Sequence, residues 1–275
     1  IPEPIVNFHL LRNVPLSVGS LMGLIFGIGL FGTTFVLPQF TQELLGYSAY
    51  DAGLVLFPRA LTLFLFMPVV GWLYKHVDAR ITVAFGLGML YWSFQGLSHL
   101  TLGIDFRHLA PMLLIMGAGM PFMFVTLTTV SLATIPREHM TEASSLYTLS
   151  RRIGGNIGYA LVATIVANRM QYHRSHLVDT FSIYNSLFER RLDMLTGGLE
   201  RAGMGAYQAA HAAMGILARE MGQQATMLAY NDVSKIMGWM FVAAAPLLIV
   251  LPSQRMMRGA LAAKRERDGA GGGGH

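Results

Sequence analysis

Residues 13–42 read NVPLSVGSLMGLIFGIGLFGTTFVLPQFTQ, thirty residues between Arg12 and Glu43 without a formally charged side chain. A bilayer core about 30 Å thick is crossed by a helix of about 20 apolar residues, whereas core helices of soluble proteins are rarely so long. Five more stretches follow this pattern: 52–74, interrupted only by Arg59, and the uncharged stretches 81–104, 109–136, 153–168 and 236–254. We therefore expect an all-α integral membrane protein with six spans, at about 16–38, 52–74, 82–102, 109–133, 143–168 and 230–252.

The composition supports this class and excludes others. Charged residues make up 13% of the chain and hydrophobic residues 53%, whereas about a quarter of a typical soluble domain is charged. The nine histidines lack metal-ligand spacing, there is no cysteine, and the sequence has no Gly-Lys-Ser/Thr loop for a nucleotide phosphate. We therefore expect no enzyme, no metal site and no cofactor, with an ion gradient or a missing part of the protein as the energy source. The basic residues form no stripe, so the net charge of +5 favours anionic lipid headgroups over nucleic acid as the counter-charge.

The cations in the short loops predict the orientation, because Lys and Arg collect on the cytoplasmic side of a membrane. Those expected on one side are Arg12, Lys75, Arg80, Arg137, Arg151, Arg152 and the cations of the tail. The opposite short loops, 39–51 and 103–108, contain Arg107 as their only cation. Both termini are therefore expected in the cytoplasm, with residues 1–15 as a lead-in and residues 253–275 as a disordered, basic and glycine-rich tail.

The long connection 169–229 is then expected outside the cytoplasm. It contains two segments with a helical pattern, around 178–196 and 206–229, which Gly197-Gly198 and Gly203 would separate. A connection of this length inside a compact domain is usually functional or forms a packed cap. Two interpretations stay open: an element that docks a partner, and a structural lid.

Glycines recur at helical spacing in two of the predicted spans. They are Gly19, Gly23 and Gly27 in the first span and Gly154, Gly155 and Gly158 in the fifth. Residues four apart share one face of a helix, and a stripe without side chains lets a neighbouring helix approach closely. We expect both stripes to be helix-packing surfaces, with sliding during a conformational cycle as the alternative.

Arg59 is the charge that lies well inside a predicted span, about 12 Å along the helix from Asp51 at about 1.5 Å per residue. An ionisable residue within the membrane indicates a functional site by default. Two interpretations stay open: Arg59 faces a water-filled cavity and binds substrate or a carboxylate, or its side chain extends to the outer interface near Asp51. A substrate-binding arginine favours anionic or neutral substrates over cationic ones.

Uncharged polar and aromatic side chains within the spans complete the candidate substrate cavity. An amide in lipid needs hydrogen-bond partners for both of its groups, whereas a threonine hydroxyl often donates to a nearby carbonyl. Aromatic rings either pack against lipid and other helices or form an apolar wall that binds drugs. The candidates, with Arg59, are Gln39, Thr126, Asn156, Phe35 and Phe122.

Several segments resemble one transporter family. Residues 37–48, LPQFTQELLGYS, and 51–59, DAGLVLFPR, are similar to the first outer loop and the following helix in the carboxy-terminal half of fourteen-helix drug:proton antiporters of the major facilitator superfamily, the EmrB/QacA type. Gly71, Asp78 and Arg80 match a degenerate copy of that superfamily's cytoplasmic loop motif, with Lys75 in place of the usual acid. Further similarity lies in Ile135-Pro136, Ala143-Ser144-Ser145, Arg152 to Gly158, and Gln223 to Val233.

The resemblance, which covers residues 5–252, implies the carboxy-terminal half of a major facilitator fold and therefore a missing amino-terminal membrane half. It implies part of a proton-coupled secondary transporter in a bacterial inner membrane, exporting hydrophobic drugs or related small molecules by alternating access. It also implies a gating role for Gly71, Asp78 and Arg80, and a periplasmic adaptor protein of a tripartite pump as a further partner. Asp232 is a marginal candidate for proton coupling. The alternatives are an exporter of another cargo and a membrane scaffold or assembly protein without transport activity.

Overall fold

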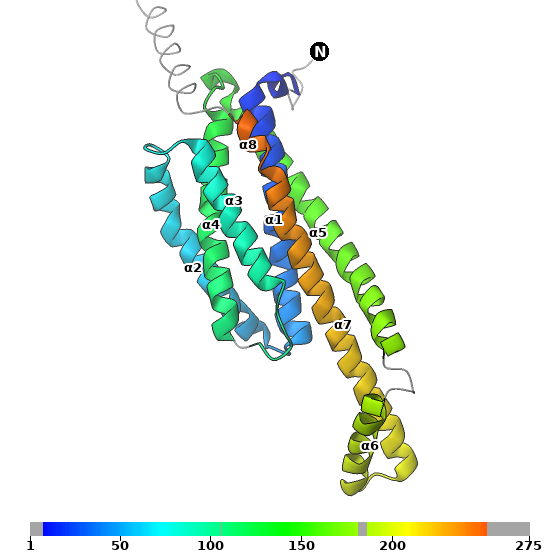
Figure 1. The fold of residues 1–275 in the computed structure, drawn as a ribbon. Helices are drawn as coiled ribbons and strands as arrows, with labels where there is room; N and C mark the ends of the chain where they lie inside the picture. Colours follow the sequence, from blue (N-terminus) through cyan, green and yellow to red (C-terminus); the bar gives the residue numbers. More distant parts are fainter. Residues whose placement is uncertain (1–7, 105, 181–185, 252–275) are drawn as a thin grey trace, which may run out of the picture.

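A computed structural model describes residues 8–104, 106–180 and 186–251, and within these ranges the chain forms helices and connecting turns but no strand (Figure 1). The expectation of an all-α protein is confirmed. The elements are η1 (Phe8–Arg12), α1 (Val14–Gln39), the π-helix η2 (Phe40–Leu44), α2 (Ala49–Leu73), α3 (Ala79–Leu97), α4 (Phe106–Leu132), η3 (Arg137–His139), α5 (Met140–Thr180), α6 (Ser186–Arg201), α7 (Ala206–Ala244) and α8 (Leu247–Val250). The expected tail, 253–275, and residues 1–7 of the expected lead-in lie outside the described residues.

Short polar side chains start the first three helices. Asn13 accepts a hydrogen bond from the backbone N–H of Leu16 at 3.4 Å, and Ser48 accepts one from Asp51 at 3.1 Å. Asp78 accepts one from Arg80 at 3.0 Å. Such caps satisfy N–H groups that have no partner in the first turn of a helix. These helices therefore begin two or three residues before the spans expected from hydropathy.

Four helical segments in the described part of the chain are long and apolar enough to cross a membrane. They are Val14–Leu44, Ala49–Leu73, Phe106–Leu132 and Ala206–Val250. The helices α3 and α5, expected as two further spans, are not among them. Polar residues such as Gln95 in α3 and Asn156 in α5 lower the hydropathy of these helices, so length and composition alone support four spans and not six.

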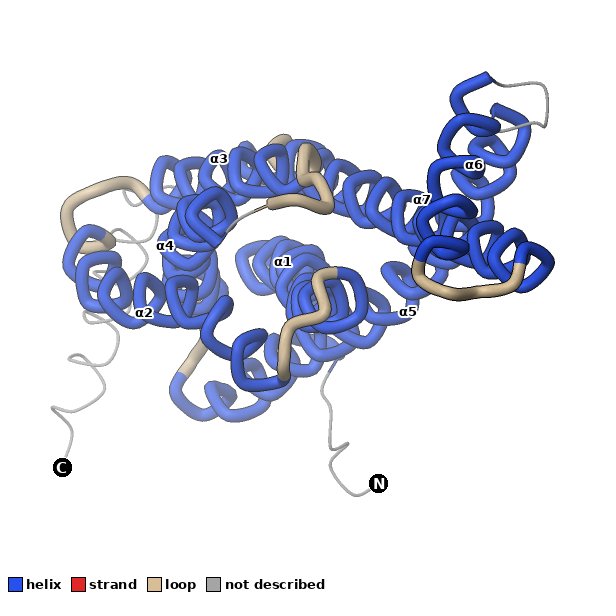
Figure 2. The backbone as a smooth tube through the Cα atoms, turned by 90° about the horizontal axis from the view of Figure 1, so that it is seen from below, coloured by secondary structure: helices blue, strands red, loops and turns tan. Residues whose placement is uncertain are grey.

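The helices form two layers. α1 packs against α5 and α4, and α4 packs against α2, so that these four helices form a row in the order α2, α4, α1 and α5. α3 and α7 pack against each other behind the row, α3 on α4 and α7 on α5 (Figure 2). The buried core contains side chains from every long helix of the bundle, including Phe26, Leu90, Met123 and Phe241.

The glycines of α1 and α5 lie where these two helices meet. A Cβ built at Gly158 would be 2.8 Å from the Cα of Ile28, and one at Gly154 would be 2.8 Å from the carbonyl carbon of Leu24. A Cβ at Gly27 would be 3.2 Å from the carbonyl carbon of Arg151. These distances leave no room for a side chain, so the two backbones are in direct contact. Among the other glycines singled out above, Gly155 faces the Phe31 ring, Gly23 faces Tyr147, and Gly19 faces Ser131 of α4.

The connection 169–229 is largely an extension of the bundle helices. α5 continues without a break to Thr180, and α7 is a single helix from Ala206 into the bundle. The pair Gly197-Gly198 does not separate two helices as expected, because both glycines lie inside α6. The chain instead turns at Gly203, which has a φ of 95°. α6 and the first half of α7 form a helical hairpin that projects from the bundle (Figure 1).

Gly158→Ala in the full-length protein should lower the Tm, because the added Cβ would meet the backbone of Ile28. Overpacking of this kind costs about 1–3 kcal/mol. Gly88→Ala on α3 is the matched control, since a Cβ there meets nothing within 4 Å and alanine favours the helix over glycine. Thermal unfolding in detergent measures both variants. A Tm of Gly158→Ala equal to that of Gly88→Ala would contradict the backbone contact between α1 and α5.

Candidate functional site

Arg59 lies in the middle of α2 and reaches across to α1. Its Nη2 donates a hydrogen bond to Oγ1 of Thr34 at 3.1 Å, and its side chain is partly buried. The backbone of Arg59 packs against α4, since a Cβ built at Gly117 would be 2.9 Å from its carbonyl carbon. Arg59 therefore does not extend along α2 toward Asp51, whose carboxylate instead bonds the hydroxyl of Ser48 at 2.7 Å.

Aromatic side chains continue the same surface from α1 to α5. Phe35, one residue after Thr34, makes an edge-to-face contact with Tyr159 at 5.9 Å between ring centroids. Phe31 contacts the same tyrosine at 5.8 Å. Edge-to-face pairs of this kind are favourable and hold rings in defined orientations. Tyr159 was not among the sequence candidates, although it follows Asn156 by three residues and so lies near it on α5.

Two other candidates lie away from this cluster or at its margin. Asn156 is exposed on α5. Gln39 is at the end of α1, where its amide donates to Glu43 at 3.3 Å. A glutamine bonded to a neighbour one turn away satisfies part of its own hydrogen-bonding capacity, and the structure does not bring Gln39 together with Arg59.

Thr126 and Phe122 do not reach the exposed surface of the row. Thr126 is 0% exposed, and its hydroxyl has no hydrogen-bond partner among the described residues. Phe122 is buried between layers, where its ring lies 5.0 Å from that of Phe85 on α3 and 6.3 Å from that of Phe66 on α2. Both are α4 side chains that pack inside the bundle, so as placed they line no open cavity.

A second arginine joins the surface that Arg59 occupies. The guanidinium of Arg151 lies over the ring of Phe124 with its central carbon 4.7 Å from the centroid. Arg151 comes from α5, and Phe124 comes from α4. The loop-charge pattern places Arg151 among the cytoplasmic cations. Its position eight residues inside the expected span 143–168 was a signal that it lies deeper.

Comparison with known proteins identifies the family. The model of the Major Facilitator Superfamily matches residues 1–159. The chain belongs to the major facilitator superfamily. The colistin resistance protein EmrB of Acinetobacter baumannii is 24% identical over 250 residues, which are 91% of this chain and 48% of that protein. The multidrug export protein EmrB of Escherichia coli K12 is 28% identical over 235 residues, 84% of this chain and 44% of that protein.

The chain therefore spans about half the length of the curated relatives that it matches. A third relative, the MFS-type transporter YhcA of Bacillus subtilis, is 26% identical over 180 residues, 66% of this chain and 34% of that protein. The resemblance to an EmrB-type facilitator is confirmed. Membership of this superfamily and the apolar helices indicate a multi-pass membrane protein, and the superfamily is one of transporters and not of enzymes.

The candidate gating residues of this facilitator chain lie at the end of the bundle that holds the N-terminus. Arg80 Nε donates to the backbone carbonyl of Leu251 at 2.7 Å, which ties the start of α3 to the end of α8. Asp78 caps α3 through the N–H of Arg80. Gly71 is in α2, and a Cβ there would meet nothing within 4 Å. The structure brings Asp78 and Arg80 together but leaves Gly71 without a close contact that requires glycine.

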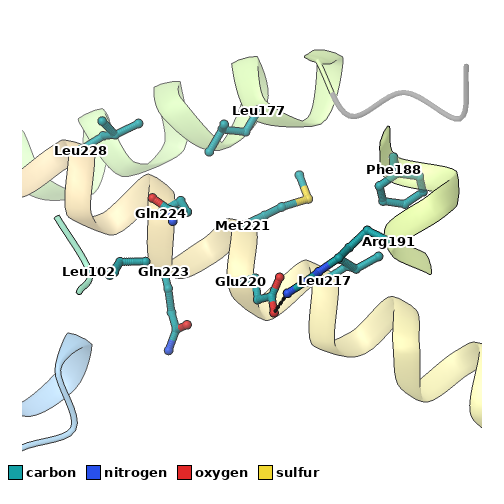
Figure 3. Close-up of a pocket in the computed structure, with 10 residues that line it drawn as sticks. All are labelled: Leu102, Leu177, Phe188, Arg191, Leu217, Glu220, Met221, Gln223, Gln224 and Leu228. Atoms are coloured by element: carbon teal, nitrogen blue, oxygen red, sulfur yellow. Dashed lines mark hydrogen bonds and ion pairs between the residues drawn. The ribbon is translucent and has the colours of Figure 1, made fainter. Parts of the chain in front are cut away.

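The opposite end of this facilitator chain has two features that the sequence did not predict. Asp232 of α7 is 2.9 Å from Nε2 of His173 and 3.6 Å from Nε of Arg169, which tie α7 to the extension of α5. A pocket of about 650 Å³ lies further out, and Figure 3 shows side chains of α5, α6 and α7 around it. The Arg191–Glu220 pair, at 3.4 Å, joins α6 to α7 there. Its lining also includes Leu102 of the α3–α4 connection and Leu177 of α5, and it is separate from the surface around Arg59.

Single cysteines can test which candidates are reachable by water, because the sequence contains no cysteine of its own. Thr34→Cys and Asn156→Cys should react readily with a charged maleimide in the full-length protein, whereas Thr126→Cys should be protected, since exposure governs thiol reactivity. Labelling rates in membrane vesicles measure this difference, with any cysteines elsewhere in the full-length protein replaced. Equal labelling of Thr34→Cys and Thr126→Cys would refute the placement of these residues.

Proposed function

We propose that this chain forms one half of a proton-coupled secondary transporter that exports hydrophobic drugs or related small molecules by alternating access. The observation that carries the proposal is the surface formed by α2, α4, α1 and α5. It presents Arg59, Thr34, Phe35 and Tyr159 well inside α2, α1 and α5, with no other described element over them. Polar and aromatic side chains at that depth suit a substrate path between two halves.

The chain length relative to its relatives supports the idea of a half. The superfamily binds substrates near the midplane, between two bundles that move relative to each other. A chain that aligns to 48% and 44% of two EmrB proteins would supply one of these bundles, and a preceding membrane half would supply the other. The names of those relatives describe colistin resistance and multidrug export, which favours apolar drugs as cargo.

Six spans, with both termini in the cytoplasm of a bacterium and the bundle in its inner membrane, fit this function. The four apolar segments would supply four of these spans. The helices α3 and α5, which pack within the same bundle, would supply the other two. The loop cations favour this orientation, because most of them lie at the end of the bundle that holds the N-terminus. The hairpin of α6 and α7 would then project into the periplasm.

Proton coupling would depend largely on the other half. Three carboxylates with described partners lie near helix ends: Glu43 beside Gln39, Asp51 beside Ser48, and Glu142 beside His139. Asp232 lies at the outer end of the bundle and is already paired with His173 and Arg169. A proton-carrying acid works best at the midplane, where protonation and substrate binding compete, and no described carboxylate of this half occupies that depth.

The hairpin is the proposed docking element for a periplasmic adaptor. Its outer surface exposes Met194, Tyr207 and Met214, which are 62%, 77% and 54% exposed. Exposed methionine and aromatic side chains are typical of protein-binding surfaces. The projecting hairpin lies beyond the bundle, so these side chains are within reach of a partner outside the membrane.

Tyr159→Ala should slow export by the full-length protein, because it removes the ring contacts that hold Phe31 and Phe35. The assay is energy-dependent accumulation of a hydrophobic dye in inverted membrane vesicles, with and without collapse of the proton gradient. Trp92→Ala is the control, since Trp92 is also an exposed aromatic but lies on α3 in the second layer. Absence of gradient-dependent accumulation in the wild type, across several apolar dyes, would favour the scaffold alternative and reject the exporter.

Replacing Met194, Tyr207 and Met214 with serine should weaken capture of the proposed periplasmic adaptor by the full-length protein. The exposed positions carry little packing, so the Tm of the variant should stay at the wild-type value. Tyr50→Ser is the control, since Tyr50 is 74% exposed at the start of α2 and outside the hairpin. Co-purification measures capture. Undiminished capture by the triple variant would leave the hairpin as a structural lid.

A further inference from the structure

Arg59 and Arg151 occupy corresponding positions in two similar groups of helices. The helices α1, α2 and α3 form one trio, and α4, α5 and α7 form the other. The first helix of each trio packs against the second helix of the other trio, α1 on α5 and α4 on α2. Each arginine lies on the second helix of its trio, about 15–17 Å from the start of that helix at about 1.5 Å per residue.

The environments of the two arginines correspond as well. The carbonyl carbon of Arg59 lies 2.9 Å from a Cβ built at Gly117 of α4, and that of Arg151 lies 3.2 Å from one built at Gly27 of α1. Each side chain reaches the other of these two helices: Arg59 bonds Thr34 of α1, and Arg151 covers Phe124 of α4. Both guanidinium groups therefore lie along the seam between α1 and α4.

The spacing between the two arginines follows from the helices that they touch. Along α1, the backbone carbonyl of Arg151 lies beside Gly27, and the guanidinium of Arg59 bonds Thr34. Along α4, the backbone carbonyl of Arg59 lies beside Gly117, and the guanidinium of Arg151 lies over Phe124. Each pair is separated by two turns of helix, so the two positions are about 10 Å apart along the bundle.

Neither arginine has a counter-charge in the described part of this half. The ion pairs among residues 8–104, 106–180 and 186–251 include neither one. One N–H of Arg59 bonds a neutral hydroxyl, although a guanidinium has five N–H donors in a fork that matches a carboxylate. The contact of Arg151 with Phe124 holds the guanidinium in place but leaves the charge uncompensated, since a cation–π contact is much weaker than an ion pair within a membrane.

We propose that Arg59 and Arg151 are two successive binding positions for the carboxylate of an apolar organic acid. The proposal rests on the proposed transport function and names the substrate class of that path. Arg59 lies nearer the end of the bundle with α6, and Arg151 lies nearer the end with the N-terminus. A carboxylate passing along the seam leaves one arginine for the other, while its apolar part contacts the rings of Phe35 and Phe124.

The experiment compares naphthoate with its uncharged methyl ester on the purified full-length protein in nanodiscs of phosphatidylcholine. Arg59→Gln and Arg151→Gln should each raise the Kd for naphthoate about tenfold, the worth of a charge-assisted hydrogen bond, and leave the Kd for the ester unchanged. Combining both substitutions should abolish specific binding of naphthoate. Arg152→Gln is the matched control, since Arg152 is the next residue on α5 and is exposed.

Arginine-to-lysine variants show whether a loss of naphthoate binding results from misfolding. Arg59→Lys and Arg151→Lys keep the charge but lose the bidentate fork, so they should bind naphthoate with intermediate affinity at a wild-type Tm. Equal weakening for naphthoate and the ester would overturn the proposal, because it would show a structural role alone. Unchanged naphthoate binding would also overturn it, and altered binding of phosphatidylglycerol in that case would assign the arginines to a lipid headgroup.

This binding assay is independent of export. Arginine-dependent naphthoate binding in a protein that exports no dye would reject the proposed function and retain the anion positions. Gradient-dependent dye export, with naphthoate binding unchanged in both arginine variants, would support the proposed function and reject the anion positions.

Discussion

The contact between α1 and α5 is made by backbone atoms, and the positions of the other functional elements depend on it. Lipid surrounds apolar side chains as favourably as a neighbouring helix does, so helices in a membrane gain stability chiefly from close packing and hydrogen bonds. Gly154 and Gly158 allow that packing, because α1 lies where their side chains would be. The same contact places the backbone of Arg151 against Gly27 and so fixes how far the Arg151 guanidinium reaches toward α4. A larger residue at any of these glycines would move the site as well as the helix.

Polar groups along the seam are held by short, specific contacts and not by a charged network. A charge in a membrane helix is unfavourable unless it faces water, a partner or a protein interior. Thr34 gives Arg59 one acceptor, and Phe124 gives Arg151 an aromatic face. Both contacts leave donors available, whereas the paired charges at the α6 end, such as Asp232 with His173, are already satisfied. The guanidinium groups of Arg59 and Arg151 therefore keep unused hydrogen-bond donors on the surface that we propose for substrate passage.

The sequence predicts the helices well because a long uncharged stretch satisfies its backbone hydrogen bonds in lipid by forming a helix. It predicts contacts between helices less well, since apolar composition on every side of a helix does not indicate which face meets a neighbour. Thr126 and Phe122 illustrate this: both are plausible cavity residues by type, and tertiary packing buries both inside the bundle. Arg151 illustrates a different difficulty, because a cation near a span boundary is read as a loop charge.

Glycine was informative in one place and misleading in another. In α1 and α5 its spacing indicated close approach, because successive glycines share one helix face. In α6, Gly197 and Gly198 suggested a break, yet a glycine lowers helix stability by only about 1 kcal/mol, which packing can offset. α6 gains that packing from α7, whose Ala209, Ala213 and Leu217 are buried at four-residue spacing. The turn forms instead at Gly203, where a positive φ makes glycine the favoured residue.

The hairpin is mechanically part of the bundle, because α7 runs from the outer turn to the core without a break. The inner half of α7 is held by Phe241, whose ring lies 5.7 Å from that of Phe94 on α3. At the point where α5 and α7 leave the bundle, Asp232 joins them through His173. A continuous helix fixed at two levels does not swing freely at its outer end. Rotation of this half against another would therefore carry the hairpin with it, and a partner bound to the hairpin would resist or follow that rotation.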